Sequence, residues 1–181
     1  MQRIALFLLC LAVWIAPLPA AILEHLSLDE LTTQSTAVVR ARVTGSYTDF
    51  RGSLIYTHWK LQILDSLKGP ERASGEVLIP GGRVGGVHQD VAGAPKLLMG
   101  KEYLLFLWTS RSGATYITGL SQGVFELSKN PTEALIVSRR ATGEPMLERG
   151  SWKVVREENT QMLYSEIVSR IAAAGSSGGT R

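Results

Sequence analysis

Residues 54–64 alternate between two kinds of side chain, and this pattern constrains the fold more than any other part of the chain. One set is largely apolar and comprises Ile55, Thr57, Trp59, Leu61 and Ile63. The other set is mostly polar and comprises Tyr56, His58, Lys60 and Gln62. Because successive side chains of a strand point to opposite faces, the alternation predicts a strand with one buried face. A strand of this length is expected to bend, or to pair with two partners around a barrel.

Other segments predict a chain built mainly of short strands. Residues 37–44 alternate in the same way, with Val39, Ala41 and Val43 on one face and Arg40 and Arg42 on the other. A polar, turn-like segment is expected at residues 45–52. Further strands are expected at residues 76–80, 87–91, 101–108, 115–119, 123–127 and 134–137, with a hairpin loop at 110–113.

Two helices are expected, one near each end of the chain. Ser27 and Glu30 form a capping-box pattern, which predicts a short helix that ends near residue 34. A second helix is predicted at about residues 160–174, and its apolar stripe comprises Leu163, Ile167 and Ile171. Gly175 is expected to be its C-cap, and residues 176–181 are expected to form a disordered tail.

The expected connections between the strands are turns and glycine-containing loops, whereas an α/β fold would need helical stretches there. We therefore expect a mainly β protein. The expected fold is a small, closed or partly open OB-like β-barrel with a short N-terminal helix and a C-terminal helix. Residues 21–175 are expected to form this single domain, and the chain has no internal repeat.

The beginning of the chain has the pattern of a cleavable secretory signal peptide over residues 1–20. Arg3 supplies the positive charge, an uncharged apolar run follows at residues 4–16, and Pro17 and Pro19 end it. We place the cleavage site after Ala20. An uncleaved membrane anchor is the alternative, but the run is shorter than the roughly 20 residues that a spanning helix needs. We therefore expect an exported protein, periplasmic or secreted, with no stable membrane span after cleavage.

Removal of the signal peptide determines which chemistries the mature chain can use. Cys10 is the one cysteine of the chain, so a mature chain that begins at residue 21 has no disulfide, cysteine nucleophile or thiolate zinc site. Loss of Arg3 lowers the basic residues from 19 to 18 against 16 acidic ones, a net charge of about +2. This small charge argues against nucleic acid as a partner. The mature protein is expected to be a monomer.

The order and spacing of several short pieces resemble a family of exported bacterial proteins with no assigned activity. The pieces are Leu-Asp-Glu-Leu at 28–31, Thr-Ala-Val-Val-Arg-Ala-Arg-Val at 36–43, Ile-Tyr-Thr at 55–57, Ile-Leu-Asp-Ser-Leu-Lys-Gly at 63–69, Pro-Gly-Gly at 80–82, Gly-Ala-Pro at 93–95, Gly-Lys-Glu-Tyr-Leu-Leu-Phe-Leu at 100–107 and Gln-Gly-Val-Phe at 122–125. More distantly, the layout is similar to the OB-type barrels of netrin-like and metalloproteinase-inhibitor domains. Those inhibitors act through an N-terminal cysteine, which the mature chain lacks, so the resemblance implies only the barrel.

A glycine-rich loop at residues 81–86 and the residues after it form one candidate site. The loop lacks the Gly-Lys-Ser/Thr ending of a phosphate loop and the spacing of a dinucleotide-binding loop. It is either a bulge or tight crossing at a barrel corner, or a flexible lip beside a binding face, with Arg83 as its only charge. His88 and Asp90 share a strand face, so their side chains could share a metal ion or a proton.

The polar face of the long strand is a second candidate site. Tyr56, His58 and Lys60 mix an aromatic ring with hydrogen-bonding groups, and OB barrels bind ligands across such a face. No Gly-x-Ser-x-Gly motif is present, and the acidic residues are scattered over the strands, so hydrolase chemistry has little support.

The sequence favours a non-catalytic, exported binding module whose partner is another exported protein or a cell-envelope polymer. Its expected binding residues are Tyr56, His58, Lys60, Arg83, His88 and Asp90, and neither a cofactor nor a metal ion is expected. The alternative is a hydrolase or metal-dependent enzyme that uses His88, Asp90 and His58. A third hypothesis, a structural domain once joined to a larger exported enzyme, remains open.

Overall fold

The structure is a computed structural model that describes residues 23–70, 75–156 and 158–177. The predicted signal peptide at residues 1–20 and the end of the predicted tail at 178–181 lie outside the described residues. The described part of the chain is mainly β, with two α-helices and one short 3-10 helix. Neither of its α-helices has the length and apolar character needed to span a membrane.

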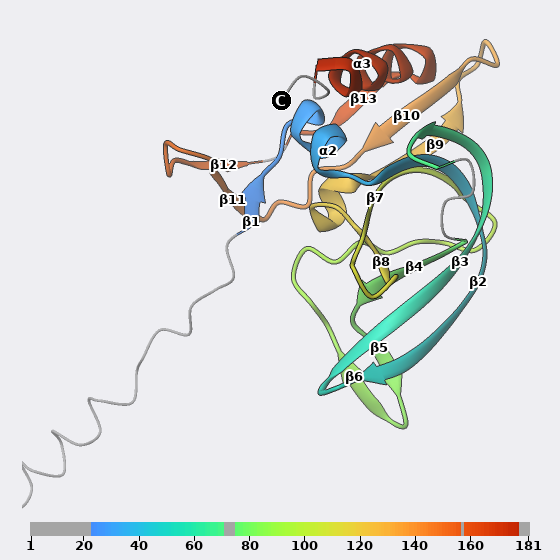
Figure 1. The fold of residues 1–181 in the computed structure, drawn as a ribbon, viewed down its shortest axis with the longest axis vertical. Coiled ribbons are helices and arrows are strands. Elements are labelled where there is room, and N and C mark those ends of the chain that lie inside the picture. The colour runs from blue at the N-terminus through green and yellow to red at the C-terminus, as the bar shows by residue number, and fades with distance from the viewer. Residues whose placement is uncertain (1–22, 71–74, 157, 178–181) are drawn as a thin grey trace, which may run out of the picture.

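Thirteen strands and three helical segments follow one another along the described chain (Figure 1). The first half contains β1 (Leu23–His25), α2 (Leu28–Gln34), β2 (Ala37–Arg51), β3 (Leu54–Lys68), β4 (Glu76–Pro80), β5 (Gly82–Val84) and β6 (Val87–Gln89). The second half contains β7 (Glu102–Thr109), β8 (Thr115–Ile117), the 3-10 helix η2 (Leu120–Gly123), β9 (Val124–Lys129), β10 (Leu135–Arg139), β11 (Pro145–Glu148), β12 (Val154–Arg156), β13 (Thr160–Leu163) and α3 (Tyr164–Ser177).

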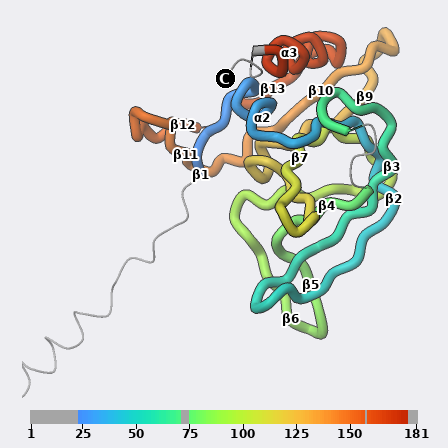
Figure 2. The backbone as a smooth tube through the Cα atoms, in the orientation of Figure 1, coloured from blue at the N-terminus to red at the C-terminus, as the bar shows by residue number. Residues whose placement is uncertain are grey.

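Five of the strands close a ring in the order β2, β3, β4, β8 and β7. Strand β2 pairs antiparallel with both β3 and β7, and β3 pairs antiparallel with β4. Strand β4 pairs in parallel with β8 through Leu78 and Tyr116, and β8 then pairs antiparallel with β7. Figure 2 shows how β2 and β3 curve together around one side of this ring. Beyond β7 the same sheet continues through β9, β10 and β13.

The interior of the ring is filled by apolar side chains that alternate along its strands. Its buried members are Ala37, Val39, Ala41, Val43, Leu61, Val77, Ile79, Leu97, Tyr103, Leu105, Leu107 and Ile117. Trp59 and Ile63 pack against them, so the predicted inward faces of residues 37–44 and 54–64 are confirmed. Because the two long strands alternate strictly here, their polar side chains lie on the outside of the ring.

A second core lies on the outer side of β2 and β7, beneath the two α-helices (Figure 1). It contains Leu26, Leu31, Val38, Leu104, Phe106, Phe125, Leu127, Val137, Ile167 and Ile171. The central strands β2 and β7 are therefore covered on both faces, which explains why residues 103–107 form a continuous buried run. The helices α2 and α3 pack against each other above this core.

The structure confirms both predicted helices and corrects their surroundings. Helix α2 begins with the predicted capping box of Ser27 and Glu30. The predicted second helix was placed too early, because Thr160–Leu163 form β13, which pairs with β10. The same helix continues through Gly175 to Ser177, so Gly175 is not a C-cap and the predicted tail starts too early.

The predicted polar turn at residues 45–52 is wrong, because β2 continues to Arg51 and only Gly52 and Ser53 form the turn. A β-bulge lies between Val43 and Gly45, where the register with β3 shifts by one residue. The residues after the bulge are polar because this half of the β2–β3 hairpin extends beyond the core, not because the strand ends. A bulge also reverses which side chains face outward in the residues after it.

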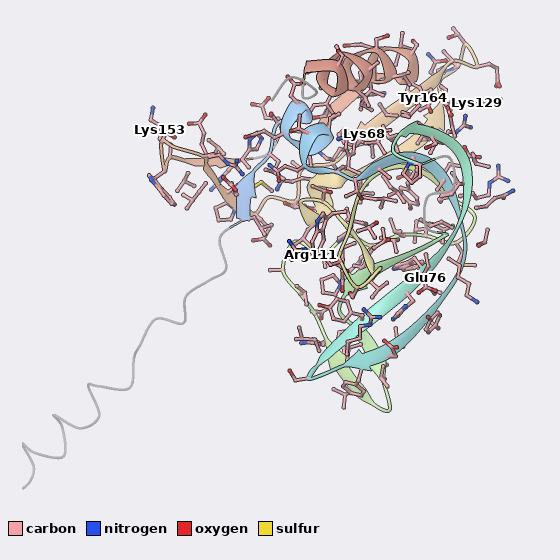
Figure 3. The ribbon with its side chains drawn as sticks, in the orientation of Figure 1. Lys68, Glu76, Arg111, Lys129, Lys153 and Tyr164 are labelled. Atoms are coloured by element: carbon pink, nitrogen blue, oxygen red, sulfur yellow. The ribbon has the colours of Figure 1, made fainter. Side chains whose placement is uncertain are left out.

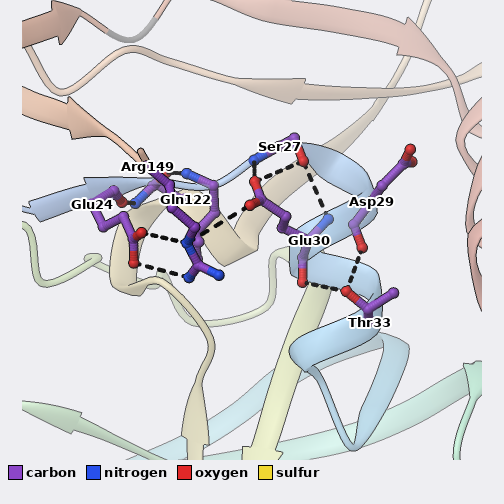
Figure 4. A network of polar contacts seen from close by, with 8 residues as sticks. Glu24, Ser27, Asp29, Glu30, Thr33, Gln122 and Arg149 are labelled. Carbon is purple, nitrogen blue, oxygen red and sulfur yellow. Dashed lines mark hydrogen bonds and ion pairs between the residues drawn. The ribbon is translucent and has the colours of Figure 1, made fainter. Parts of the chain in front are cut away.

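A small three-stranded sheet of β1, β11 and β12, which the sequence did not predict, projects from the body of the molecule (Figure 1). Strand β1 pairs in parallel with β11, and β11 pairs antiparallel with β12. Figure 4 shows how polar contacts hold β1 in place. The Arg149 guanidinium pairs with the Glu24 carboxylate, at 2.5 Å from Nε to Oε1. The buried Gln122 amide accepts a hydrogen bond from the Leu26 N–H and donates one to the Glu24 carbonyl.

Candidate functional site

A row of side chains runs around the outside of the ring, with one residue from each strand. Cross-strand pairing places Tyr47 opposite His58, His58 opposite Leu78, Leu78 opposite Tyr116, and Tyr116 opposite Trp108. Directly opposed residues share a sheet face, so these five side chains all point away from the core. The row joins the predicted binding residue His58 to strands β4, β7 and β8.

Three aromatic rings at one end of this row contact one another, and we call them the aromatic surface: Tyr56, Trp108 and Tyr116. The ring centroid of Tyr116 lies 5.5 Å from that of Trp108 and 6.1 Å from that of Tyr56. The Trp108 side chain is exposed to 46% of its full area. Arg51 Nη1 lies 3.5 Å from the Tyr116 hydroxyl. Tyr56 and Tyr116 are half-buried, so the predicted residue Tyr56 belongs to an aromatic surface across three strands in which Trp108 is the exposed ring.

Sequence reasoning missed Trp108 and Tyr116 because each needs a pairing that is not local. The signal for Trp108 was present, since it follows Leu107 in a strand whose alternate residues Leu105 and Leu107 lie inside the ring. Strand β8 is only three residues long, and its place beside β4 depends on a parallel pairing through Tyr116. No local pattern predicts such a pairing.

His58 lies on the predicted outer face, but it is not open to a ligand. Its Nδ1 is 2.8 Å from Glu76 Oε1, and its Nε2 is 2.9 Å from Asp49 Oδ1. The Tyr47 ring stacks on the imidazole at 4.4 Å between centroids, which leaves His58 only 3% exposed. Both contacts are hydrogen bonds when the imidazole carries two protons. His58 therefore links β2 to β4, and its ring is covered by Tyr47 and held between two carboxylates.

Lys60 and the Tyr47 hydroxyl also lie near the carboxylates that hold His58. Lys60 is exposed, and its ammonium nitrogen lies 5.9 Å from the centroid of the Tyr47 ring. The Tyr47 hydroxyl lies 3.3 Å from both carboxylate oxygens of Glu76. Desolvation, followed by the negative charge of Glu76, raises the pKa of Tyr47. This hydroxyl therefore stays protonated and donates a hydrogen bond to Glu76.

Arg83, His88 and Asp90 lie together at a different place, on and beside the hairpin of β5 and β6. Arg83 and His88 are paired across this hairpin, and His88 Nδ1 lies 3.5 Å from Asp90 Oδ2. His88 and Asp90 line a cavity with Thr57 and Trp59, whose side chains point into the ring side of β3. His58 lies between these two residues and points to the opposite face. The structure therefore does not bring His58 together with His88 and Asp90.

The geometry offers little to an enzyme that uses these three residues. Both ring nitrogens of His58 already face carboxylates, and His88 and Asp90 are exposed. Within the described ranges, no group of three or more His, Cys, Asp or Glu side chains could hold a metal ion.

The predicted glycine loop contains a close crossing followed by a hairpin turn. A Cβ on Gly82, which has a φ of +139°, would lie 2.7 Å from Thr57 Oγ1 and 2.9 Å from Thr48 Cγ2. Only glycine allows the chain to cross β2 and β3 this closely. Gly85 and Gly86, with φ of +55° and +84°, then form the turn between β5 and β6. Of the two interpretations of the loop, the structure favours the tight crossing at Gly82.

No protein-family model matches the chain, and no curated protein matches it in sequence. The resemblance to exported bacterial proteins and to netrin-like barrels therefore stays a prediction.

Proposed function

We propose that this protein is an exported, monomeric, non-catalytic binding module whose ligand is an extended cell-envelope polymer. The observation that carries this proposal is the chain of ring contacts from Tyr56 through Tyr116 to Trp108 on the outside of the ring. Aromatic rings that lie side by side and open to solvent provide stacking surfaces for successive units of a polymer.

The proposal includes an OB-like barrel, and the strand order supports it. In chain order, the ring-forming strands are β2, β3, β4, β7 and β8, and we count them as strands one to five. Around the ring their order is one, two, three, five and four, and the parallel pair joins strands three and five. OB barrels are five-stranded Greek-key barrels that bind oligosaccharides and oligonucleotides over the second and third strands and adjacent loops. Here these strands are β3 and β4. Tyr56 lies on β3, and Arg51 and Trp108 lie next to the two corresponding loops.

The charges near the aromatic surface favour a neutral polymer over a nucleic acid. Arg51 and Lys60 are balanced by Asp49 and Glu76 on the same outer face. A site for a phosphate backbone needs an excess of Lys and Arg. A glycan strand needs none, because its sugar rings stack their C–H faces on aromatic rings and form hydrogen bonds at their edges. We therefore infer a glycan of the cell envelope as the ligand.

Co-sedimentation of the purified exported protein with peptidoglycan sacculi tests this proposal. The wild-type protein is expected to sediment with the sacculi, and Trp108→Ala is expected to weaken binding about tenfold through loss of one stacking partner. Trp152→Ala is the matched control, because Trp152 is also exposed but lies in the loop between β11 and β12, away from the ring. Equal retention of the two variants, or retention of neither the variants nor the wild type, would contradict the proposal.

A further inference from the structure

A cavity of about 390 Å³ opens at one end of the ring, between β3, β4, the β5–β6 hairpin and residues 90–98. It is separate from the aromatic surface, because Thr57 and Trp59 point into it whereas Tyr56 points to the other face of β3. Its volume lies in the range of pockets that hold small molecules, and the mouth of a barrel is a common place for them.

Apolar side chains form one part of the cavity lining: Trp59, Ile79, Pro80, Val91, Pro95 and Leu97. Thr57, His88, Gln89, Asp90 and Lys96 supply the polar part. Leu98 also lines the cavity, and it is 57% exposed, while the neighbouring Met99 is 58% exposed. Leu98 and Met99 are adjacent and exposed to water, so they extend the apolar surface of the cavity outward at its mouth. A ligand with an apolar body would bury both the walls and this lip.

The rim of the cavity carries one positive charge without a partner among the described residues. On one side, His88 Nδ1 lies 3.5 Å from Asp90 Oδ2. Lys96 lines the cavity on the other side and is exposed. Its ammonium group makes no ion pair or hydrogen bond with any residue that the structure describes. Lys96 is therefore a charged group of the rim that an anionic group of a ligand can pair with.

We propose that this cavity binds a small amphiphile with one anionic head group, such as a fatty acid. The apolar chain lies between Trp59 and Leu97, and the carboxylate lies at the rim beside Lys96. A cationic amphiphile of the same length gains no ion pair with Lys96.

Calorimetric titration of the purified protein with decanoate, below the concentration at which it forms micelles, tests this inference. Saturable binding of one decanoate per protein is expected, and decyltrimethylammonium of the same chain length is expected to bind at least about fivefold more weakly. Lys96→Met should weaken decanoate binding about fivefold. Lys153→Met is the matched control, since Lys153 lies on the projecting sheet far from the ring (Figure 3), and it should change nothing.

Two further variants keep the test independent of folding and of the proposed glycan binding. Leu98→Asp places a negative charge at an exposed position of the lip and should weaken decanoate binding without loss of stability. Trp108→Ala should leave decanoate binding unchanged, because Trp108 lies on the outer face. Absence of saturable decanoate binding, equal affinity of Lys96→Met and Lys153→Met, or equal binding of the cationic amphiphile would overturn the inference.

Discussion

The ammonium group of Lys68 in β3 donates a hydrogen bond to the backbone carbonyl of Thr32 in α2, at 2.5 Å. The same group donates to the Ser35 carbonyl at 2.8 Å, so Lys68 satisfies carbonyls that the end of the helix leaves open. Figure 3 shows Lys68 beside α2, on the outer side of the ring. Desolvation lowers the pKa of Lys68, as expected for an ammonium held against protein rather than water.

Replacement of Lys68 by Met should therefore destabilise the protein by about 1–2 kcal/mol, because the helix carbonyls lose their donor. Urea unfolding followed by circular dichroism measures this change. Lys129→Met is the control, since Lys129 pairs with the exposed Glu133, and the change should alter the stability by less than about 0.5 kcal/mol. Equal losses in the two variants would contradict the capping role.

Tyr164 at the start of α3 should make the stability sensitive to alkaline pH. Burial, followed by the negative charge of Asp65, raises the pKa of Tyr164 to about 12. The folded state thus holds this proton more tightly than the unfolded state, so its contribution is constant below about pH 10 and is lost between about pH 10 and 12. Tyr164→Phe should remove roughly 1 kcal/mol of that alkaline loss, once solvent screening is allowed for. Urea unfolding at several values from pH 8 to 11.5 measures it, and an unchanged slope in the variant would contradict the assignment.

Glu102 should make the stability of the protein sensitive to acidic pH. Hydrogen bonds from Arg40, together with those from Arg42, lower the pKa of the Glu102 carboxyl despite partial burial. A lowered folded-state pKa gives stability that is present above the unfolded value of about 4.5 and is lost as the pH falls below it. Glu102→Gln should destabilise the protein by about 1 kcal/mol at pH 7 and much less at pH 3. Glu133→Gln, in an exposed pair, is the control, and an equal effect of Glu102→Gln at both pH values would refute the argument.

The same change, glycine to alanine, should have opposite effects at Gly123 and Gly175. A Cβ on Gly123 would lie 2.2 Å from the Thr118 carbonyl oxygen, so Gly123→Ala should destabilise the protein by at least about 2 kcal/mol. A Cβ on Gly175 meets nothing within 4 Å, and Gly175 lies in helix α3. Gly175→Ala should therefore stabilise the protein by up to about 1 kcal/mol. Thermal unfolding of the two variants measures both effects, and a change of the same sign in both would contradict the structure.

Much of the fold could be predicted from local patterns. The capping box of Ser27 and Glu30 and the alternation around Leu61 are both confirmed, because each depends on residues close together in the chain. The projecting sheet could not be predicted, since β11 and β12 are short and β11 pairs with β1, which is far away in the sequence. The start of α3 was misplaced because the apolar residues of β13 continue the helical pattern.

The candidate site was predicted only in part, and the bulge in β2 is one reason. Strict alternation from Val39 through Val43 would turn Tyr47 and Asp49 toward the interior. The register shift between Val43 and Gly45 reverses the two faces, so Tyr47 lies outside, opposite His58. This reversal is what covers His58 and gives it a second carboxylate. The sequence alone predicted the correct face for His58, but it predicted an exposed side chain.

The sequence by itself determined a mainly β chain with inward faces along two long strands and a helix near each end, because these properties depend on side-chain periodicity and local capping. Tertiary structure alone decided which outer side chains meet. The parallel pairing of Leu78 with Tyr116 assembles the aromatic surface, and the crossing at Gly82 closes one end of the ring beside the cavity. Each of these depends on register and on contacts between distant segments, which no local pattern encodes.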